Sequence, residues 1–451
     1  MTFDLQQVAR IIGAPGRFPD VSVTGWSVDT RTQIPGDLYF ALRGPNHDGH
    51  TYIPAALEKG PVVSRAGCHP ARRLPTGALL EVPDPLLALQ TLAAHARQTW
   101  PGTVVAVTGS AGKTTAKDAI AHLLSEALPT GKTIGNLNNH IGVPLSILRL
   151  PADDRAAVLE MGMNHAGELR ALAAIAKPDI AVVTNVGYAH VEFFESIDGV
   201  AAAKRELVES LPPSGVAVLN ADDPRVLAFR DTHPGRTVTF GLSERAMVRA
   251  ERVEILPNGS RFRALGVDFE TAAAGRHNVM NLLAALAVSS VFEIAPDRLR
   301  EAVRSFSPGK MRGERIERNG IVIWNDCYNS NPEAAESMLD VLRETPAARR
   351  IAVMGEMLEL GDSAADLHRR VGHYAASRGI DFLIGVRGNA RAMVESAAES
   401  GLSAAFVEDP IFAGRRAGEA AHSGDAILFK GSRGVHIEDA LEVFLKLKAD
   451  G

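Results

Sequence analysis

The first hundred residues combine short apolar segments with glycine and proline turns. A helical pattern over 85–99 closes this region, and Trp100, Pro101 and Gly102 follow it as a linker. The expected strands cover 21–26, 37–42 and 78–82. This pattern predicts a small mixed α/β domain that ends near residue 100.

From Thr103 onward, buried apolar runs alternate with helical patterns. The expected strands cover 104–108, 156–159, 179–184 and 216–220, and the expected helices cover 114–128, 166–176 and 197–210. Strands that alternate with helices form parallel sheets covered by those helices. We therefore expect a doubly wound parallel sheet, followed by a β-rich segment over 237–271 and a helix that begins at the sequence GRHNVMN.

The turn Ser307-Pro308-Gly309 predicts a second boundary, and a helix is expected over 435–448 near the end of the chain. Between them, strands are expected over 321–324, 350–353, 382–386, 404–407 and 426–429. The chain thus reads as an α/β protein of three domains. These are a small mixed α/β domain over 1–100, a central P-loop domain with a doubly wound sheet over 101–308, and a Rossmann-like domain over 309–451.

Composition fits this organisation and excludes several classes of protein. A length of 451 residues fits about three domains at roughly 150 residues each. Hydrophobic residues make up 46% and charged residues 22%, which excludes wholesale disorder. The net charge of −5 argues against a general nucleic-acid binder, and two cysteines exclude a disulfide scaffold or a cysteine zinc site. Without a signal peptide or an apolar run of about 18 residues, we expect a cytoplasmic protein with no membrane segment.

The strongest motif is TGSAGKTT, Thr108 to Thr115, between an expected strand and an expected helix. Small residues let backbone N–H groups approach phosphate oxygens, and a helix N-terminus attracts negative charge. Lys113 would neutralise the β- and γ-phosphates of ATP, and the Thr114 hydroxyl would hold Mg²⁺. Val107 stands where the strict motif has its first glycine, so a glycine-rich turn with an incidental lysine is the alternative. The residues expected to bind ATP here are Gly109, Ser110, Ala111, Gly112, Lys113, Thr114 and Thr115.

Three more residues are candidates for the site, two after expected strands and one on an expected helix. Glu160 and His190 each follow a strand of the central sheet, at the edge where ligands gather. Mg²⁺ prefers oxygen ligands, so Glu160 is a candidate ligand, although a capping or ion-paired glutamate is equally consistent. A lone histidine such as His190 is more often structural. Lys204 reads, by itself, as a surface lysine on an amphipathic helix.

Several segments together resemble the Mur ligases over nearly the whole chain. They are SVDTRTQIPGDLYFALRG, TGSAGKTT, GNLNNHIGVPLSIL, EMGMNHAGEL, TNVGYAHVEFF, HNVMNLLAA, YNSNP, GEMLELG and FKGSRG. YNSNP and GEMLELG are similar to the branch of that family that adds D-alanyl-D-alanine to UDP-N-acetylmuramoyl-tripeptide. The resemblance implies an ATP-dependent ligase that forms an amide bond through an acyl phosphate, in cytoplasmic peptidoglycan precursor synthesis.

The resemblance also implies roles for individual residues. It assigns catalysis to Lys113, His190 and Lys204, and two Mg²⁺ ions to Thr114, Glu160, His190 and Lys204, with Lys204 carbamylated. It adds Asn281, Arg312 and Asp326 to the ATP site. It assigns substrate binding to Ser27, Asp29, Arg31, Asn138, Asn139, Tyr328, Asn329, Asn331, Lys430 and Ser432. Basic neighbours at Lys310 and Arg315 leave the choice of Arg312 open.

Some of these residues also have ordinary structural explanations. Ser27, Asp29 and Arg31 alternate as on one strand and so would share a face, but Asp29 and Arg31 also fit a surface ion pair. Asn281 could be a surface residue of its helix. Asn331 before Pro332 fits a helix cap. The sequence around Lys430 and Ser432 also fits a solvated basic turn.

Two other functions fit part of the sequence. A related amide ligase such as folylpolyglutamate synthetase would share the phosphate loop, but the first hundred residues and YNSNP argue against it. A P-loop ATPase or nucleotide-binding regulatory module would leave Glu160, His190 and Lys204 without a shared task. We expect a monomer that binds neither nucleic acid nor membrane.

Overall fold

The computed structural model describes residues 1–68, 79–256 and 258–448. Contacts divide the chain into two compact units. The first unit is Met1–Val107, Ala127–Ala181 and Glu206–Val216, and the second is Thr108–Glu126, Val182–Arg205 and Ala217–Gly451. The described chain is an α/β protein, as expected, and its longest sheet has seven strands in the order β13-β12-β11-β10-β7-β9-β8.

In the first unit, four parallel strands form a small sheet in the order β3-β4-β5-β6. The core packed against this sheet includes Tyr39 and Val62 of the sheet and Ile53 of the following helix. A second, antiparallel pair joins β1 to β2. The elements are β1 (Phe3–Asp4), α1 (Leu5–Ile12), β2 (Ser22–Val23), β3 (Gly25–Ser27), β4 (Asp37–Phe40), η1 (Gly49–Tyr52), α2 (Ile53–Leu57), β5 (Val62–Arg65) and β6 (Leu79–Val82). Ala78, which was expected to begin the last of these strands, lies outside the described residues.

Helix α3 (Pro85–Thr99) has the predicted bounds. The Asp84 carboxylate accepts the first N–H groups of the helix, and Pro85 fits the first turn, where no N–H is needed. Near its other end, Arg97 donates to the Ala176 carbonyl and pairs with Asp179 at 3.0 Å. The rest of this unit includes β7 (Thr103–Thr108) up to Val107, β8 (Thr130–Lys132), α5 (Gly142–Leu148), β9 (Ala156–Glu160) and α6 (Glu168–Ala176).

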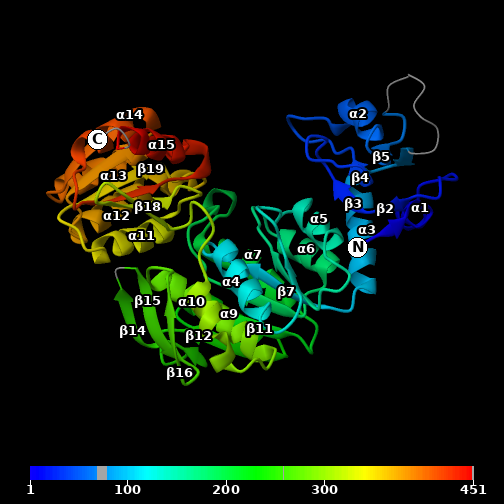
Figure 1. The fold of residues 1–451 in the computed structure, drawn as a ribbon, viewed down its shortest axis with the longest axis horizontal. Coiled ribbons are helices and arrows are strands. Elements are labelled where there is room, and N and C mark those ends of the chain that lie inside the picture. The colour runs from blue at the N-terminus through cyan, green and yellow to red at the C-terminus, as the bar shows by residue number, and fades with distance from the viewer. Residues whose placement is uncertain (69–78, 257, 449–451) are drawn as a thin grey trace. The chain divides into compact units, whose positions relative to one another are not determined.

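In the second unit, the predicted final α/β region forms a six-stranded sheet in the order β17-β18-β22-β19-β20-β21. Figure 1 shows this sheet between α11 and α12 on one side and α14 and α15 on the other. The charged strand β17 is antiparallel to β18, and the other neighbours are parallel. The elements are β17 (Glu314–Arg318), β18 (Ile321–Asp326), α11 (Pro332–Glu344), β19 (Arg350–Gly355), η5 (Gly361–Ser363), α12 (Ala364–Ser377), β20 (Phe382–Val386), α13 (Ala390–Glu399), β21 (Ser403–Val407), α14 (Pro410–Ala420), β22 (Ala426–Lys430), η6 (Arg433–Val435) and α15 (Ile437–Leu447).

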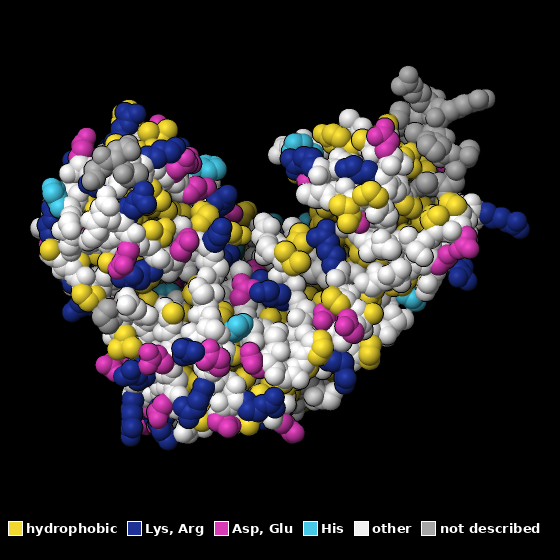
Figure 2. Space-filling view, viewed as in Figure 1, with side chains coloured by type: hydrophobic (Ala, Val, Ile, Leu, Met, Phe, Trp, Pro, Cys, Tyr) yellow, Lys and Arg dark blue, Asp and Glu magenta, His cyan; other side chains and the backbone are white. Residues whose placement is uncertain are grey.

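The predicted β-rich segment 237–271 divides between two sheets. Strands β12 and β13 continue the seven-stranded sheet, whereas β14, β15 and β16 form an antiparallel sheet of their own. Figure 2 shows basic and acidic side chains interspersed over this small sheet, where Arg261 pairs with Glu270. The strands are β12 (Arg236–Gly241), β13 (Val248–Arg249), β14 (Glu251–Leu256), β15 (Gly259–Ala264) and β16 (Val267–Thr271).

The expected helix over 114–128 is shorter in the structure. Helix α4 (Lys113–Leu124) begins one residue earlier and packs against α9 (Arg276–Val291). The remaining elements are β10 (Ile180–Val183), η2 (Val191–Phe193), α7 (Ile197–Glu209), β11 (Val216–Asn220), α8 (Pro224–Ala228), η3 (Phe229–Thr232), η4 (Pro296–Leu299) and α10 (Arg300–Ser305). No helix of the described residues is long and apolar enough to cross a membrane.

Candidate active site

The loop between β7 and α4 requires glycine at two positions. Gly109 and Gly112 have positive φ angles of 152° and 79°. A Cβ on Gly109 would lie 1.9 Å from Thr184 Oγ1, and one on Gly112 would lie 2.7 Å from Asn281 Oδ1. The strand–glycine–helix geometry that a phosphate site needs is therefore present, with Thr114 and Thr115 in the first turn of α4.

A segment after β10 holds this loop in shape. The Ala111 N–H donates to Asn185 Oδ1 at 2.8 Å, and Asn185 Nδ2 returns a bond to the Ala111 carbonyl at 3.0 Å. Ser110 and Gly187 exchange two hydrogen bonds through the serine hydroxyl. Asn185 was not predicted as a site residue. Its place directly after a parallel strand is a signal that could have identified it.

Lys113 folds back over the loop that precedes it. Its Nζ donates to the Gly109 carbonyl at 2.8 Å and lies 3.4 Å from the Ser110 carbonyl. The ammonium is thus held beside the glycine loop. A phosphate oxygen in the loop would be within reach of this charge.

Lys204 is buried in α7 and is not the surface lysine that its sequence alone suggests. Its side chain is 2% exposed. Burial, and to a smaller extent the nearby charge of Lys113, holds the pKa of Lys204 well below its usual value. Desolvation of an ammonium favours the neutral amine, which is the nucleophilic form.

His190 lies after β10 with a φ of 62°, a left-handed conformation that is uncommon for histidine. Its Nδ1 lies 2.5 Å from Oε2 of Glu359. This contact holds the pKa of Glu359 below its usual value. Glu359 belongs to the GEMLELG segment and was not predicted as a site residue, because no local pattern links that segment to His190.

Glu160 ends β9 and is buried. Asn138 Nδ2 donates to Glu160 Oε1 at 2.8 Å, so these two predicted site residues are in contact. Asn139 has a structural task, because its Oδ1 accepts the N–H groups of Ile141 and Gly142 at the start of α5.

The two asparagines of α9 have different surroundings. Asn278 donates to the Ala274 carbonyl at 2.8 Å. Asn281 is buried beside Gly112 of the phosphate loop, so the alternative of a surface asparagine is wrong. Its contact with a bound nucleotide stays a prediction.

A buried ion pair joins the ends of two parallel strands, β18 and β22. Lys430 Nζ lies 2.5 Å from Asp326 Oδ2 and donates to the Asn329 carbonyl at 2.9 Å. Lys430 is 1% exposed, so the alternative of a solvated basic turn is wrong for it. Arg312 stacks over the Tyr328 ring, with its guanidinium 3.8 Å from the ring centroid.

The remaining polar residues of this region support the local backbone. Asn331 accepts the Ala334 N–H at 2.8 Å and caps α11, as the capping explanation predicts. Asn329 Oδ1 accepts the Ser330 N–H. The buried Ser432 hydroxyl accepts the Leu358 N–H at 2.9 Å. These bonds fix the loop shape without excluding ligand contacts by other atoms.

The prediction that Ser27, Asp29 and Arg31 share one strand face is wrong. Strand β3 ends at Ser27, and the chain then turns. Asp29 Oδ1 accepts the Arg31 backbone N–H at 2.9 Å, and the two side chains pair at 2.7 Å with Arg31 exposed. An Asp side chain that bonds two residues ahead favours a turn over a strand. The surface ion pair is therefore the arrangement that the structure contains.

Among the described residues, no cluster of three or more His, Cys, Asp or Glu side chains has metal-binding geometry. Mg²⁺ does not need such a cluster, since it keeps several waters and takes one or two carboxylates together with substrate phosphates. Thr114 and the buried carboxylate of Glu160 supply oxygen atoms of that kind. Each of these oxygen donors is, by itself, of the chemical type that Mg²⁺ prefers.

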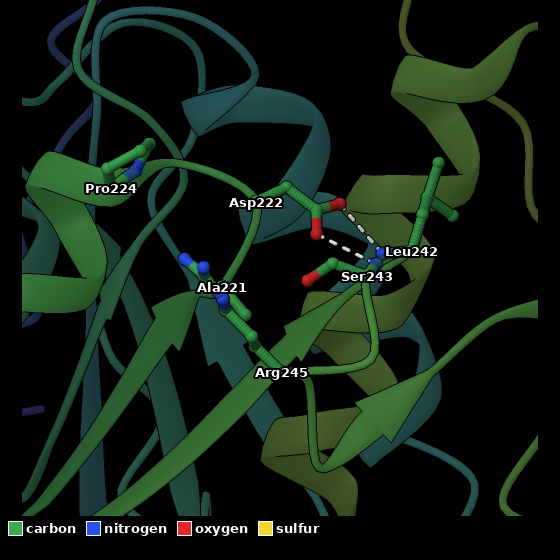
Figure 3. A pocket seen from close by; sticks show the side chains of 6 residues that line it. All are labelled: Ala221, Asp222, Pro224, Leu242, Ser243 and Arg245. Carbon is green, nitrogen blue, oxygen red and sulfur yellow. Dashed lines mark hydrogen bonds between the residues drawn. The ribbon is translucent and has the colours of Figure 1, made fainter.

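A separate open hollow of about 440 Å³ lies after β11 and β12. Figure 3 shows Asp222 pointing across it to the backbone of Leu242 and Ser243, whose N–H groups its carboxylate accepts. Its lining residues are Ala221, Asp222, Pro224, Leu242, Ser243 and Arg245. None of them belongs to the predicted site, and Asp222 is fully engaged in shaping the turn.

Known proteins match this chain along most of its length. A family model described as the Mur ligase middle domain matches residues 107–289, and one described as the Mur ligase, glutamate ligase domain matches residues 311–433. A UDP-N-acetylmuramoyl-tripeptide–D-alanyl-D-alanine ligase of Synechocystis is 35% identical over 419 residues, which cover 92% of this chain and 90% of that protein.

Solved structures agree with the sequence relatives. A crystal structure of MurF from Acinetobacter baumannii matches with a TM-score of 0.90 and 28% identity, covering 99% of both chains. MurF from Thermotoga maritima in complex with ADP matches with a TM-score of 0.82 and 28% identity, covering 95% of this chain and 99% of that one. The chain therefore belongs to the Mur ligases, in the branch of the UDP-N-acetylmuramoyl-tripeptide–D-alanyl-D-alanine ligases.

Proposed function

We propose that this enzyme joins D-alanyl-D-alanine to the terminal carboxylate of UDP-N-acetylmuramoyl-tripeptide and converts ATP to ADP and phosphate. The family supports the reaction, and the ADP complex of the Thermotoga relative supports the use of ATP. The single observation in this chain that carries the proposal is the buried Lys204 near Lys113 of the glycine loop. A simple nucleotide-binding module has no need for a second, desolvated lysine there.

The chemistry requires activation of a carboxylate. A carboxylate oxygen of the tripeptide attacks the γ-phosphorus of ATP, the bond to the bridging oxygen breaks, and ADP leaves. The amine of D-alanyl-D-alanine then attacks the acyl carbon, loses a proton and expels phosphate as the amide forms. Positioning and charge neutralisation provide most of the catalysis in such transfers.

Lys113 is proposed to stabilise the phosphoryl group during the first step. Its Nζ is already held at the Gly109 carbonyl, so little reorganisation is needed when the phosphate arrives. The backbone of Gly109 to Gly112 would cradle the phosphates. Asn281, beside Gly112, is proposed to contact the nucleotide, together with Arg312 and Asp326.

Mg²⁺ would supply positive charge that neutralises the phosphates of ATP. Thr114, Glu160, His190 and Lys204 are the residues proposed to hold two such ions. An unmodified lysine is a poor partner for a cation, so we propose that Lys204 is carbamylated. Its neutral amine would attack the carbon of CO₂, form an N–C bond and release a proton, leaving a carbamate anion. The low pKa of Lys204 supports this step because it keeps the amine neutral.

The two substrates are proposed to bind to different sets of residues. Ser27, Asp29, Arg31, Asn138 and Asn139 are proposed for UDP-N-acetylmuramoyl-tripeptide, and Tyr328, Asn329, Asn331, Lys430 and Ser432 for D-alanyl-D-alanine. We further propose functional domains over 1–100, 101–308 and 309–451, and a cytoplasmic monomer. Phosphate release measured with each substrate omitted in turn tests the function. Release without D-alanyl-D-alanine at the full rate would instead support the simple ATPase.

A further inference from the structure

His190 meets a carboxylate from a segment far away in the sequence. Oε2 of Glu359 lies 2.5 Å from its Nδ1. The separation is within hydrogen-bonding distance, so the Glu359 carboxylate can accept a proton carried on this nitrogen. The Glu359 carboxylate is therefore placed to decide which ring nitrogen of His190 carries the proton.

The backbone of both segments builds this contact. His190 and Glu359 both have left-handed φ angles, 62° and 64°, which cost energy for residues other than glycine. The Glu192 N–H donates to the Glu359 carbonyl at 3.3 Å. Gly361 sits so close to Glu192 that a Cβ would approach it to 3.0 Å. Two residues with strained backbone, a backbone hydrogen bond and this close approach make a chance meeting of flexible side chains a poor explanation.

We propose that Glu359 is a positioning residue that orients the His190 ring so that Nε2 binds a divalent metal ion. The inference rests on the proposed function, which assigns His190 to a metal. A metal-bound histidine usually donates its other ring N–H to a carboxylate or carbonyl, and this partner fixes the tautomer and the ring orientation. With the proton on Nδ1 directed at Glu359, the lone pair resides on Nε2.

The arrangement links two parts of the sequence. His190 follows a strand of the ATP-binding region, whereas Glu359 follows β19 of the region proposed to bind D-alanyl-D-alanine. The metal ligand is therefore fully oriented only when the segment around Glu359 is in place. Metal binding and the arrangement of the acceptor region are coupled through this one contact.

The test measures binding of Mn²⁺ to the whole protein, by the electron paramagnetic resonance signal of the free ion. Glu359→Gln and Glu359→Ala should weaken Mn²⁺ binding by roughly tenfold or more, the usual effect of losing such a partner. Glu192→Gln is the matched control, because this exposed glutamate in the facing segment donates its backbone N–H to Glu359, a bond that glutamine keeps. Its Mn²⁺ affinity should equal that of the unchanged protein.

A second readout reports the nitrogen ligand directly. Electron spin echo modulation from a bound imidazole nitrogen should be present in the unchanged protein and in Glu192→Gln, and lost in His190→Ala. Unchanged Mn²⁺ affinity in both Glu359 variants, with the nitrogen signal lost only in His190→Ala, would overturn the role of Glu359 and leave the metal site intact. An unchanged nitrogen signal in His190→Ala would overturn the metal assignment of the proposed function as well. Should Glu359→Ala fail to fold, the near-isosteric Glu359→Gln carries the test.

Discussion

Lys204 and Lys113 lie close enough that the charge of Lys113 adds to burial in lowering the pKa of Lys204. Two lysines near one another in a protein interior are unfavourable as two cations. The electrostatic repulsion between the two side chains is removed when Lys204 is neutral or becomes a carbamate. The interaction between Lys113 of the phosphate loop and Lys204 of α7 therefore favours the carbamylation proposed for Lys204.

Replacement of Lys204 distinguishes a carbamate from a plain lysine. Lys204→Ala should lose activity that acetate or formate partly restores, because a small carboxylate can occupy the vacated anionic site. Lys204→Arg should stay inactive, since arginine keeps a positive charge and cannot be carbamylated. Ligation rates with and without added carboxylate provide the measurement. Full activity of the Lys204→Arg variant would contradict the carbamate and indicate that Lys204 has only a structural role.

Replacement of Lys113 tests the phosphate loop. Lys113→Ala should lower the ligation rate by roughly 10²–10³-fold, or about 3–4 kcal/mol, the usual scale for losing one preorganised charge contact. Lys446→Ala is the control, because Lys446 forms an exposed ion pair with Glu442 on α15 and such pairs contribute little. Near-normal ligation by Lys113→Ala would refute the assignment.

Gly112 tests the contact between the loop and α9. Gly112→Ala places a Cβ 2.7 Å from Asn281 Oδ1 at a positive φ, so it should weaken ADP binding as well as stability. Gly135→Ala is a matched control, since Gly135 also has a positive φ but no atom within 4 Å of its added Cβ. The free energy of unfolding of Gly135→Ala should fall only by the strain of the left-handed backbone, about 1–2 kcal/mol. Its ADP affinity should stay unchanged. Calorimetric titration with ADP compares the two variants, and equal affinities would contradict a nucleotide role for this position.

Variants of the ion pair between Asp326 and Lys430 test whether it contributes to stability, to ligation or to both. Asp326→Asn leaves the Lys430 charge unpaired and should lower the free energy of unfolding by about 3–5 kcal/mol. The double variant with Lys430→Met removes both charges and should recover much of that loss. Denaturant unfolding measures the stabilities. If the double variant also ligates normally, the pair serves stability alone.

Much of the fold could be predicted from the sequence because local pattern determines it. Helix α3 and strand β11 have the predicted bounds, since caps and buried apolar runs mark their ends. Strand β17 was not expected. Its residues ERIER are charged, and it is stabilised as an edge strand by antiparallel pairing with β18, which no local pattern reveals.

The site was harder to predict where long-range packing decides the environment. The segment AAAKREL shows a lysine among small residues, and only the fold buries Lys204. Glu359 and Asn185 act through partners far away in the sequence. Asp29 and Arg31 fitted an alternating strand pattern, yet a side-chain bond to the backbone of Arg31 turned the chain instead.

The most direct test of the proposed ligase measures phosphate released from ATP in the presence of both substrates, either one, or neither. Appreciable release should require UDP-N-acetylmuramoyl-tripeptide and D-alanyl-D-alanine together, with one new amide bond formed for each phosphate. A rate that does not depend on D-alanyl-D-alanine, or phosphate release without amide formation, would contradict the account.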